Sequence, residues 1–241
     1  CRQLADTQRW FLKKYMTIKN KNSGYSILEL VLAVFTSSIV LLGAYSAYTI
    51  VAEQFKRNNL VSEIRDFAMP TIRLISRDLR LAGYKEVDAN VESTMGNIET
   101  PITITDSGTS ACCDGLQIVY DKTSTERIRV TYFIANRSNP TRKAMFMNIE
   151  TFNGSTWDMQ TQNAIVTDYV EDFQIEGRNF NSLGQPRLVN FSLIFRSRNK
   201  VNTSQNFQKP DYQAGNFTFS ANDNYLREAF ETSVRLRNIA E

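Results

Sequence analysis

The hydrophobic and polar positions divide the chain into zones with different patterns. From Leu30 to Ala52 there are 23 residues without a charged side chain. A helix of that length extends about 35 Å and can cross a bilayer core of about 30 Å. Buried helices of soluble proteins seldom contain more than about 14 uninterrupted apolar residues. The pattern therefore predicts a membrane-spanning helix over residues 25–52.

A second helical pattern follows directly and is amphipathic. Apolar residues recur at spacings of three and four, at Val61, Ile64, Ala68, Ile72, Ile75, Leu79 and Ala82. Charged residues occupy the intervening positions, which predicts one apolar stripe on a water-facing helix over residues 53–83. Gly83 is a helix C-terminal stop. Pro70 predicts a kink or a split near Met69. We expect one long, bent helix over residues 25–82.

Charged residues gather where this helix ends. Arg77, Asp78 and Arg80 are most simply a cluster of ion pairs that caps the helix or faces solvent. An interface with another subunit is the functional alternative for the same three residues.

Beyond Tyr84 the pattern changes to the period of two that is typical of strands. We expect strands over residues 101–105, 115–120, 127–134, 144–150, 165–176, 187–196 and 231–237. Residues 199–224 are rich in Asn, Gln and Ser and are expected to form a surface loop. Because the strands carry one apolar and one polar face, the sheet is expected to be antiparallel with one face on the helix. The predicted fold class is α+β, with residues 84–241 as an antiparallel β-sheet head.

The distribution of charge along the chain predicts its orientation in the membrane. The chain has 28 Lys and Arg, 25 Asp and Glu, and a formal charge of +3. Residues 1–24 carry +5, so residues 25–241 carry −2. A slightly acidic body argues against a phosphate-binding surface, and we expect no direct contact with nucleic acid. The basic flank predicts a cytoplasmic N-terminus and an exported C-terminal body. The apolar run is too long for an ordinary secretory signal, and no small-x-small cleavage site follows it.

Catalytic chemistry has little support in the sequence. There is no histidine, which removes the commonest general base and the commonest metal ligand. The chain has no Gly-x-Ser-x-Gly elbow, phosphate loop or dinucleotide fingerprint. We therefore expect no enzymatic activity and no cofactor.

Cys112 and Cys113 are adjacent in a segment that we expect to be exported into an oxidising compartment. Four states are open for them: a disulfide within the pair, a disulfide to another chain, a soft-metal site, or free loop thiols. An adjacent pair supplies no second pair of ligands, so we expect no zinc site.

One acid interrupts the apolar helix. Glu29 lies five residues after Gly24. A carboxylate inside a membrane helix is costly unless it is paired. Either Glu29 lies at headgroup depth and is stabilised by the helix N-terminus, or it awaits a cation. Cleavage after Gly24 would create such a cation, the α-amine of Tyr25, for the same subunit or for a neighbouring one. A pair between subunits would specify their axial register.

Residues 23–29 read Ser-Gly-Tyr-Ser-Ile-Leu-Glu, with lysines before them and the apolar run after them. This arrangement resembles the class III signal of type IV prepilins and type II secretion pseudopilins. The resemblance implies that residues 1–24 are a basic leader, and that a prepilin peptidase cuts between Gly24 and Tyr25 and N-methylates Tyr25. Glu29 would be the family's fifth-position glutamate. The first mature residue is usually Phe in this family, and Tyr25 keeps a ring there.

The head is similar to one group within that family, the PilW-like minor pilins. The similar segments are residues 75–84, 114–120, 169–176 and 230–238. The resemblance implies a single-pass inner-membrane protein with a periplasmic body that later enters the pilus tip. It would help to initiate pilus assembly. Its partners would be the prepilin peptidase, other minor pilins, the major pilin, a tip adhesin and inner-membrane lipid.

Two other interpretations of the sequence are open. A minor pseudopilin of type II secretion, the J subunit, shares much of the same pattern. A membrane-anchored exported enzyme or sensor is the rival of another class, and it predicts a formed catalytic pocket in the body.

Overall fold

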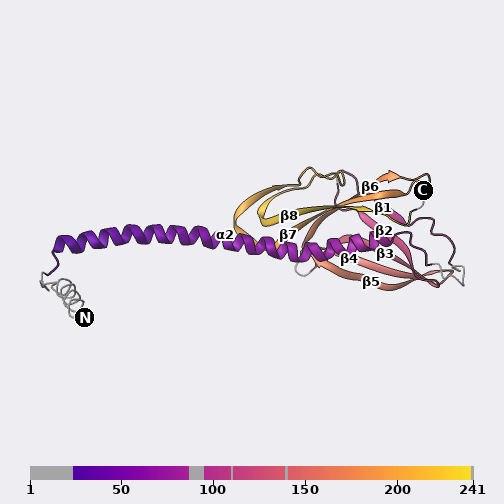
Figure 1. The fold of residues 1–241 in the computed structure, drawn as a ribbon, viewed down its shortest axis with the longest axis horizontal. Helices are drawn as coiled ribbons and strands as arrows, with labels where there is room; N and C mark the ends of the chain where they lie inside the picture. The colour runs from indigo at the N-terminus through magenta and orange to yellow at the C-terminus, as the bar shows by residue number, and fades with distance from the viewer. Residues whose placement is uncertain (1–23, 87–94, 110, 139–140, 240–241) are drawn as a thin grey trace, which may run out of the picture. The chain divides into compact units, whose positions relative to one another are not determined.

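A computed structural model describes residues 24–86, 95–109, 111–138 and 141–239 of the chain (Figure 1). Residues 1–23, which make up nearly all of the expected leader, lie outside the described residues. The chain separates into two compact units, one ending at Glu53 and the other beginning at Gln54. A single helix, α2 (Ile27–Leu81), contributes residues to both units.

The first half of α2 is apolar on every side. Each large apolar side chain from Ile27 to Val51 is more than half exposed. The hydroxyls of Thr36, Ser37 and Ser38 donate to backbone carbonyls of the preceding turn, so they do not need water. By length and composition the helix is able to span a membrane, and none of its apolar stretch is buried. The described residues of this chain therefore do not cover the apolar stretch.

The second half of α2 packs on the strands along one stripe. Its buried residues include Leu60, Ile64, Ala68, Thr71, Ile75 and Leu79. The expected stripe is therefore confirmed except at two turns, where Leu60 and Thr71 are more buried than Val61 and Ile72. Of the kink or split expected near Met69, the split is wrong, because α2 continues through Pro70 to Leu81. Pro70 is exposed, whereas Ala68 and Thr71 beside it are buried and hold this turn on the sheets.

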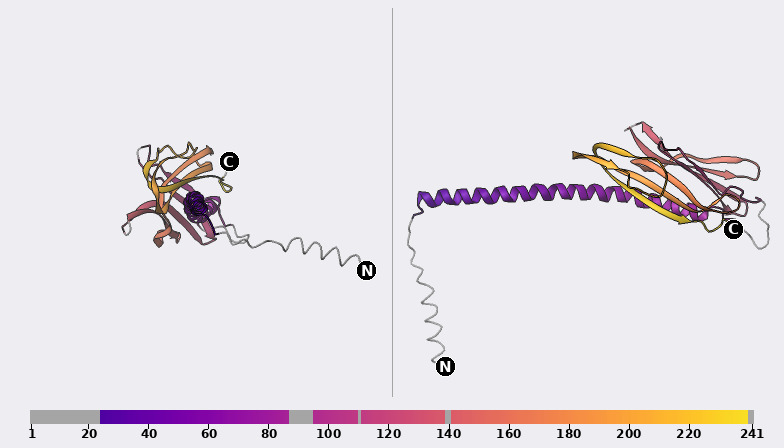
Figure 2. Two further views of the ribbon diagram at one scale, coloured as in Figure 1. Left: turned by 90° about the vertical axis from the view of Figure 1, so that its left-hand side faces the viewer. Right: turned by 90° about the horizontal axis from the view of Figure 1, so that it is seen from above.

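In the described part of the chain, eight strands form two antiparallel sheets beside this half of the helix (Figures 1 and 2). The five-stranded sheet has the order β1-β2-β3-β4-β5, and the three-stranded sheet has the order β6-β7-β8. The strands are β1 (Ile102–Thr105), β2 (Gly115–Thr123), β3 (Glu126–Ser138), β4 (Thr141–Phe152), β5 (Trp157–Asp168), β6 (Val170–Phe180), β7 (Pro186–Gln208) and β8 (Ser220–Arg235). The expected α+β layout of a long helix on antiparallel strands is confirmed.

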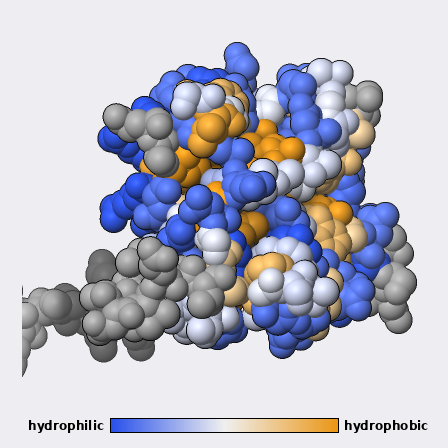
Figure 3. Space-filling model, turned by 90° about the vertical axis from the view of Figure 1, so that its right-hand side faces the viewer, coloured by the Kyte–Doolittle hydropathy of each residue, from blue (hydrophilic) through white to orange (hydrophobic). Residues whose placement is uncertain are grey.

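Both sheets and the helix share one apolar core. Its fully buried large side chains include Tyr132 of β3, Phe173 of β6 and Phe191 and Phe195 of β7. On β3, Ile128, Val130 and Tyr132 are buried as the alternating pattern predicted. Figure 3 shows one face of the molecule, which is mainly hydrophilic, with apolar residues in recesses between polar ones.

Three predictions about the strands are wrong. The head has two sheets instead of one. The strand expected over 165–176 is divided at Tyr169, whose φ of 64° separates β5 from β6 and sends them to different sheets. The loop expected over 199–224 is mostly strand, because β7 runs to Gln208 and β8 begins at Ser220. Polar residues form these long strand ends because backbone hydrogen bonds between paired strands do not require apolar side chains.

Candidate functional site

The start of α2 brings together the residues singled out around the expected cleavage point. Gly24, Tyr25 and Ser26 precede the helix and are exposed, Tyr25 by 89%. The Gly24–Tyr25 bond therefore lies outside regular structure. A peptide bond in an exposed, irregular segment is accessible to a peptidase, whereas one inside a helix is not.

Ser26 and Glu29 form a capping box at the first turn. The Ser26 backbone N–H donates to Glu29 Oε2 at 3.0 Å, and the Leu28 N–H donates to Ser26 Oγ at 3.3 Å. These bonds satisfy two of the backbone donors that a helix N-terminus leaves without a partner. The pattern Ser-x-x-Glu before an apolar run was the available sequence signal for this motif. Glu29 therefore has a local role in starting the helix, which fits the interpretation that the helix N-terminus stabilises it.

The charged residues at the end of α2 do not form one cluster. Asp78 is 1% exposed and accepts hydrogen bonds from Tyr132 Oη at 2.6 Å and from Arg77 Nε at 2.8 Å. Burial, and then the adjacent Asp78 carboxylate, raises the pKa of Tyr132 and keeps the phenol protonated as a donor. Asp78 thus ties the helix end to β3. Arg80 points elsewhere and lines a separate pocket.

Cys112 and Cys113 are joined by a disulfide next to the buried residue Asp172. The two sulfurs and an Asp172 oxygen lie within 4.8 Å of one another. Asp172 Oδ1 accepts a 3.0 Å bond from Gln174 Nε2, whereas Oδ2 has no hydrogen-bond partner among the described residues. Burial raises the pKa of Asp172. Thiolates, not disulfide sulfurs, bind metals, so these residues offer a soft-metal site only when the disulfide is reduced.

Two buried acids in the head hold segments together, and sequence reasoning missed both. Arg127, 6% exposed, donates to Asp121 at 2.7 Å across the β2–β3 hairpin. Asp114 accepts from the Ser107 N–H and from the Ile175 N–H, which joins a loop of one sheet to a strand of the other. The six-residue spacing of Asp121 and Arg127 about a turn was a sequence signal. Nothing local in the sequence indicates the partner of Asp114.

A third ionic group lies where β6, β7 and β8 meet. Arg227, 3% exposed in its side chain, pairs with Glu171 at 2.5 Å and with Asp223 at 2.6 Å. Its hydrogen bonds lower the pKa of Asp223 to about 2. Arg196 also pairs with Glu171, at 3.4 Å. These bonds link β6, β7 and β8 of one sheet. This structural role accounts for the charged group without a ligand.

No protein-family model matches the chain, and neither the curated proteins nor the solved structures contain a match.

Proposed function

We propose that this protein is the precursor of a minor type IV pilin of the PilW-like group, a structural subunit that helps to initiate and cap a pilus. The observation that carries the proposal is a helix that is apolar on every side from Ile27 to Val51 and carries one acid, Glu29, in its first turn. That helix is continuous with a second half that packs on two antiparallel sheets.

Such a helix needs an apolar environment over its whole circumference. Lipid supplies this environment while the subunit is in the inner membrane, and neighbouring helices supply it in a filament. The second half of the helix and the head meanwhile share one core and belong to one compact unit that begins at Gln54. A subunit with these two parts transfers from a bilayer to a fibre without refolding the head.

In this proposal Glu29 also sets the axial offset between neighbouring subunits. In the proposal, removal of residues 1–24 creates an α-amine at Tyr25. Tyr25 is the residue before Ser26, whose backbone N–H donates a hydrogen bond to Glu29 in the uncleaved chain. Glu29 of one subunit then pairs with the Tyr25 amine of its neighbour. In a dry helix bundle an unpaired carboxylate is costly, so only one axial offset between subunits is favourable.

The test is co-expression of the full chain with a prepilin peptidase, followed by mass spectrometry of the N-terminus. We expect a product shorter by 24 residues with an N-methylated Tyr25. The Gly24→Leu variant, which alters an exposed residue without contacts, should remain full length. A wild-type chain that keeps its basic leader would overturn the proposal.

A second measurement separates a pilus subunit from a secretion pseudopilin. Processed protein in filaments sheared from the cell surface supports the pilin. Processed protein that is found only in the membrane, together with loss of enzyme secretion in a deletion strain, supports the pseudopilin instead.

A further inference from the structure

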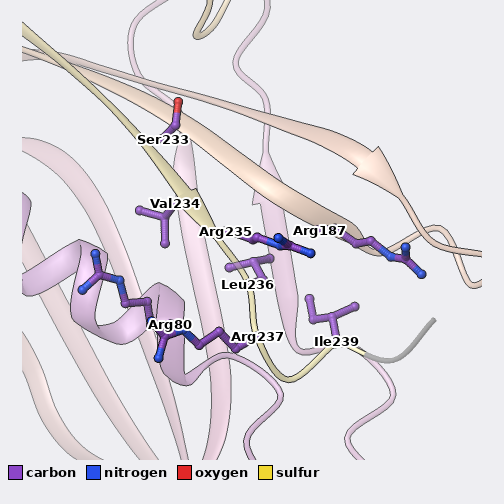
Figure 4. Close-up of a pocket in the computed structure, with 8 residues that line it drawn as sticks. All are labelled: Arg80, Arg187, Ser233, Val234, Arg235, Leu236, Arg237 and Ile239. Carbon is purple, nitrogen blue, oxygen red and sulfur yellow. The ribbon is translucent and has the colours of Figure 1, made fainter.

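The head contains a pocket of about 620 Å³ whose charged lining consists of arginine (Figure 4). The lining residues are Arg80, Arg187, Ser233, Val234, Arg235, Leu236, Arg237 and Ile239. None of them is acidic. Figure 4 shows that the arginines come from three segments: the end of α2, the start of β7, and the end of β8 with the residues after it.

Backbone and side-chain hydrogen bonds fix these three segments relative to one another. Asn238 Nδ2 donates to the carbonyl of Arg80 at 3.1 Å, and the Leu236 N–H donates to the carbonyl of Arg187 at 2.9 Å. Val234 and Leu236 are buried, at 2% and 5% exposure, and anchor the last segment in the core. The fold therefore holds the four arginine positions around one pocket, and their side chains extend from it in different directions (Figure 4).

Among the described residues, three of the four arginines that line the pocket lack the carboxylate partners that buried arginines of the head have. Buried arginines such as Arg127 pair with carboxylates of the same chain. Within the described part of the chain, Arg80, Arg235 and Arg237 form no ion pair and no side-chain hydrogen bond. Arg80 lies in the last turn of α2, where a cation stabilises the helix dipole. Arg235 and Arg237 have no such role, and an anion would relieve the repulsion between these groups.

We propose that this pocket binds a short acidic segment of a partner protein in which carboxylates flank an apolar side chain. Arginine binds carboxylates through two parallel hydrogen bonds, which favours a ligand with fixed carboxylate positions. Of the apolar lining residues, Val234 and Leu236 are buried in the core, and the partly exposed Ile239 provides the contact for an aliphatic or aromatic side chain.

The same features argue against a nucleic acid. A bound strand needs an extended basic track and aromatic side chains on which bases stack. The pocket lining contains no aromatic residue, and residues 25–241 carry a net charge of −2. The positive charge is local, which suits a compact anionic ligand. The inference concerns the head alone and does not depend on cleavage or filament assembly.

Fluorescence anisotropy of the full chain in detergent micelles tests the proposal. The probe is a labelled peptide of alternating Glu and Leu, and the control peptide has Gln in place of each Glu. We expect the acidic peptide to bind and the control peptide not to bind. We expect its Kd to rise when ionic strength increases from about 0.01 M to about 0.15 M, because salt screens exposed charges.

Variants assign the binding to this pocket. The Arg235→Gln/Arg237→Gln double variant should raise the Kd of the acidic peptide by at least about tenfold. Arg73→Gln is the matched control, because Arg73 is an exposed arginine of α2 outside the pocket, and it should leave the Kd unchanged. A double variant that binds the peptide as the wild type does would overturn the proposal.

Charge reversal at the same two positions and a nucleic-acid probe are two further tests. Arg235→Glu/Arg237→Glu should lose the acidic peptide and bind a Lys–Leu peptide instead; retention of the acidic peptide overturns the proposal. A single-stranded oligonucleotide that binds more tightly than the acidic peptide, through the same two arginines, would assign the pocket to nucleic acid and also overturn it.

Discussion

Glu29 accepts a 3.0 Å hydrogen bond from the backbone amide of Ser26, so the acid in the apolar half of α2 has a partner within its own first turn. The same carboxylate is the one that we propose to pair with a neighbour's α-amine in a filament. Glu29 therefore combines two roles that differ in what they require. A helix cap needs an acceptor oxygen, whereas an ion pair needs a negative charge.

The Glu29→Gln variant separates these roles because Gln keeps the acceptor and removes the charge. We expect it to be processed by the prepilin peptidase as the wild type is. Its amount in sheared filaments should fall strongly, because an amide does not pair with an α-amine as a carboxylate does. Immunoblots of membrane and filament fractions measure both steps.

Ser26→Ala is the complementary variant, since it removes the cap oxygen that accepts from Leu28 and keeps the charge of Glu29. It should cost about 1 kcal/mol of local helix stability and leave incorporation into filaments largely intact. If Ser26→Ala abolishes incorporation while Glu29→Gln does not, capping is the role of Glu29 and the register proposal fails.

Tyr132→Phe is expected to destabilise the head. Loss of the phenol removes a donor from the buried carboxylate of Asp78 and should lower the free energy of unfolding by about 1 to 3 kcal/mol. Tyr120→Phe is a matched control, because the half-buried Tyr120 hydroxyl makes no hydrogen bond among the described residues. Urea unfolding followed by near-ultraviolet circular dichroism measures both variants, and equal losses would contradict this role for Asp78.

Asp172→Asn is expected to stabilise the protein near neutral pH. Burial raises the pKa of Asp172 above 3.8, so its ionised form is disfavoured in the folded state. At a pH above the folded pKa the wild type bears this cost, and below about 3.8 the carboxyl is neutral in both states. The gain from Asn, about 1 to 3 kcal/mol near neutral pH, should therefore shrink as pH falls.

Thermal melting of the wild type and Asp172→Asn across this pH range is the measurement. Asn retains an oxygen to accept the bond from Gln174 Nε2, so the variant changes charge more than contacts. A variant that is less stable than the wild type near neutral pH would show that the carboxylate is favourable in its ionised form, contrary to this expectation.

Gly215→Ala should destabilise the region around Gln174, the residue that donates a hydrogen bond to Asp172. Gly215 has a φ of 72°, and a Cβ there would overlap Gln174 Cβ. Strain and overlap together should cost more than about 2 kcal/mol. Gly154→Ala is the control, because Gly154 also has a positive φ but has no atom within 4 Å of the added Cβ. Equal melting temperatures for the two variants would show that the overlap is absent in solution.

The approximate extent of α2 and its division into two patterns were predictable from the sequence. Helix periodicity is local, so the positions of Ile64, Ala68, Ile75 and Leu79 already indicate a buried stripe. The Ser26–Glu29 cap also lies within four residues and was readable in principle. Predictions failed where pairing is nonlocal, as at Tyr169, where one apparent strand supplies edges to two sheets.

The sequence by itself determined which residues are apolar together, where a helix with an apolar face continues, and that one acid lies near the start of an uncharged run. Only the tertiary structure decided that Asp78 meets Tyr132, and that arginines from residues 80, 187, 235 and 237 line one pocket. The physical reason is the distance along the sequence over which each kind of interaction acts. Side-chain periodicity depends on neighbours a few residues apart, whereas these contacts depend on which strands pair and how both sheets close on the helix.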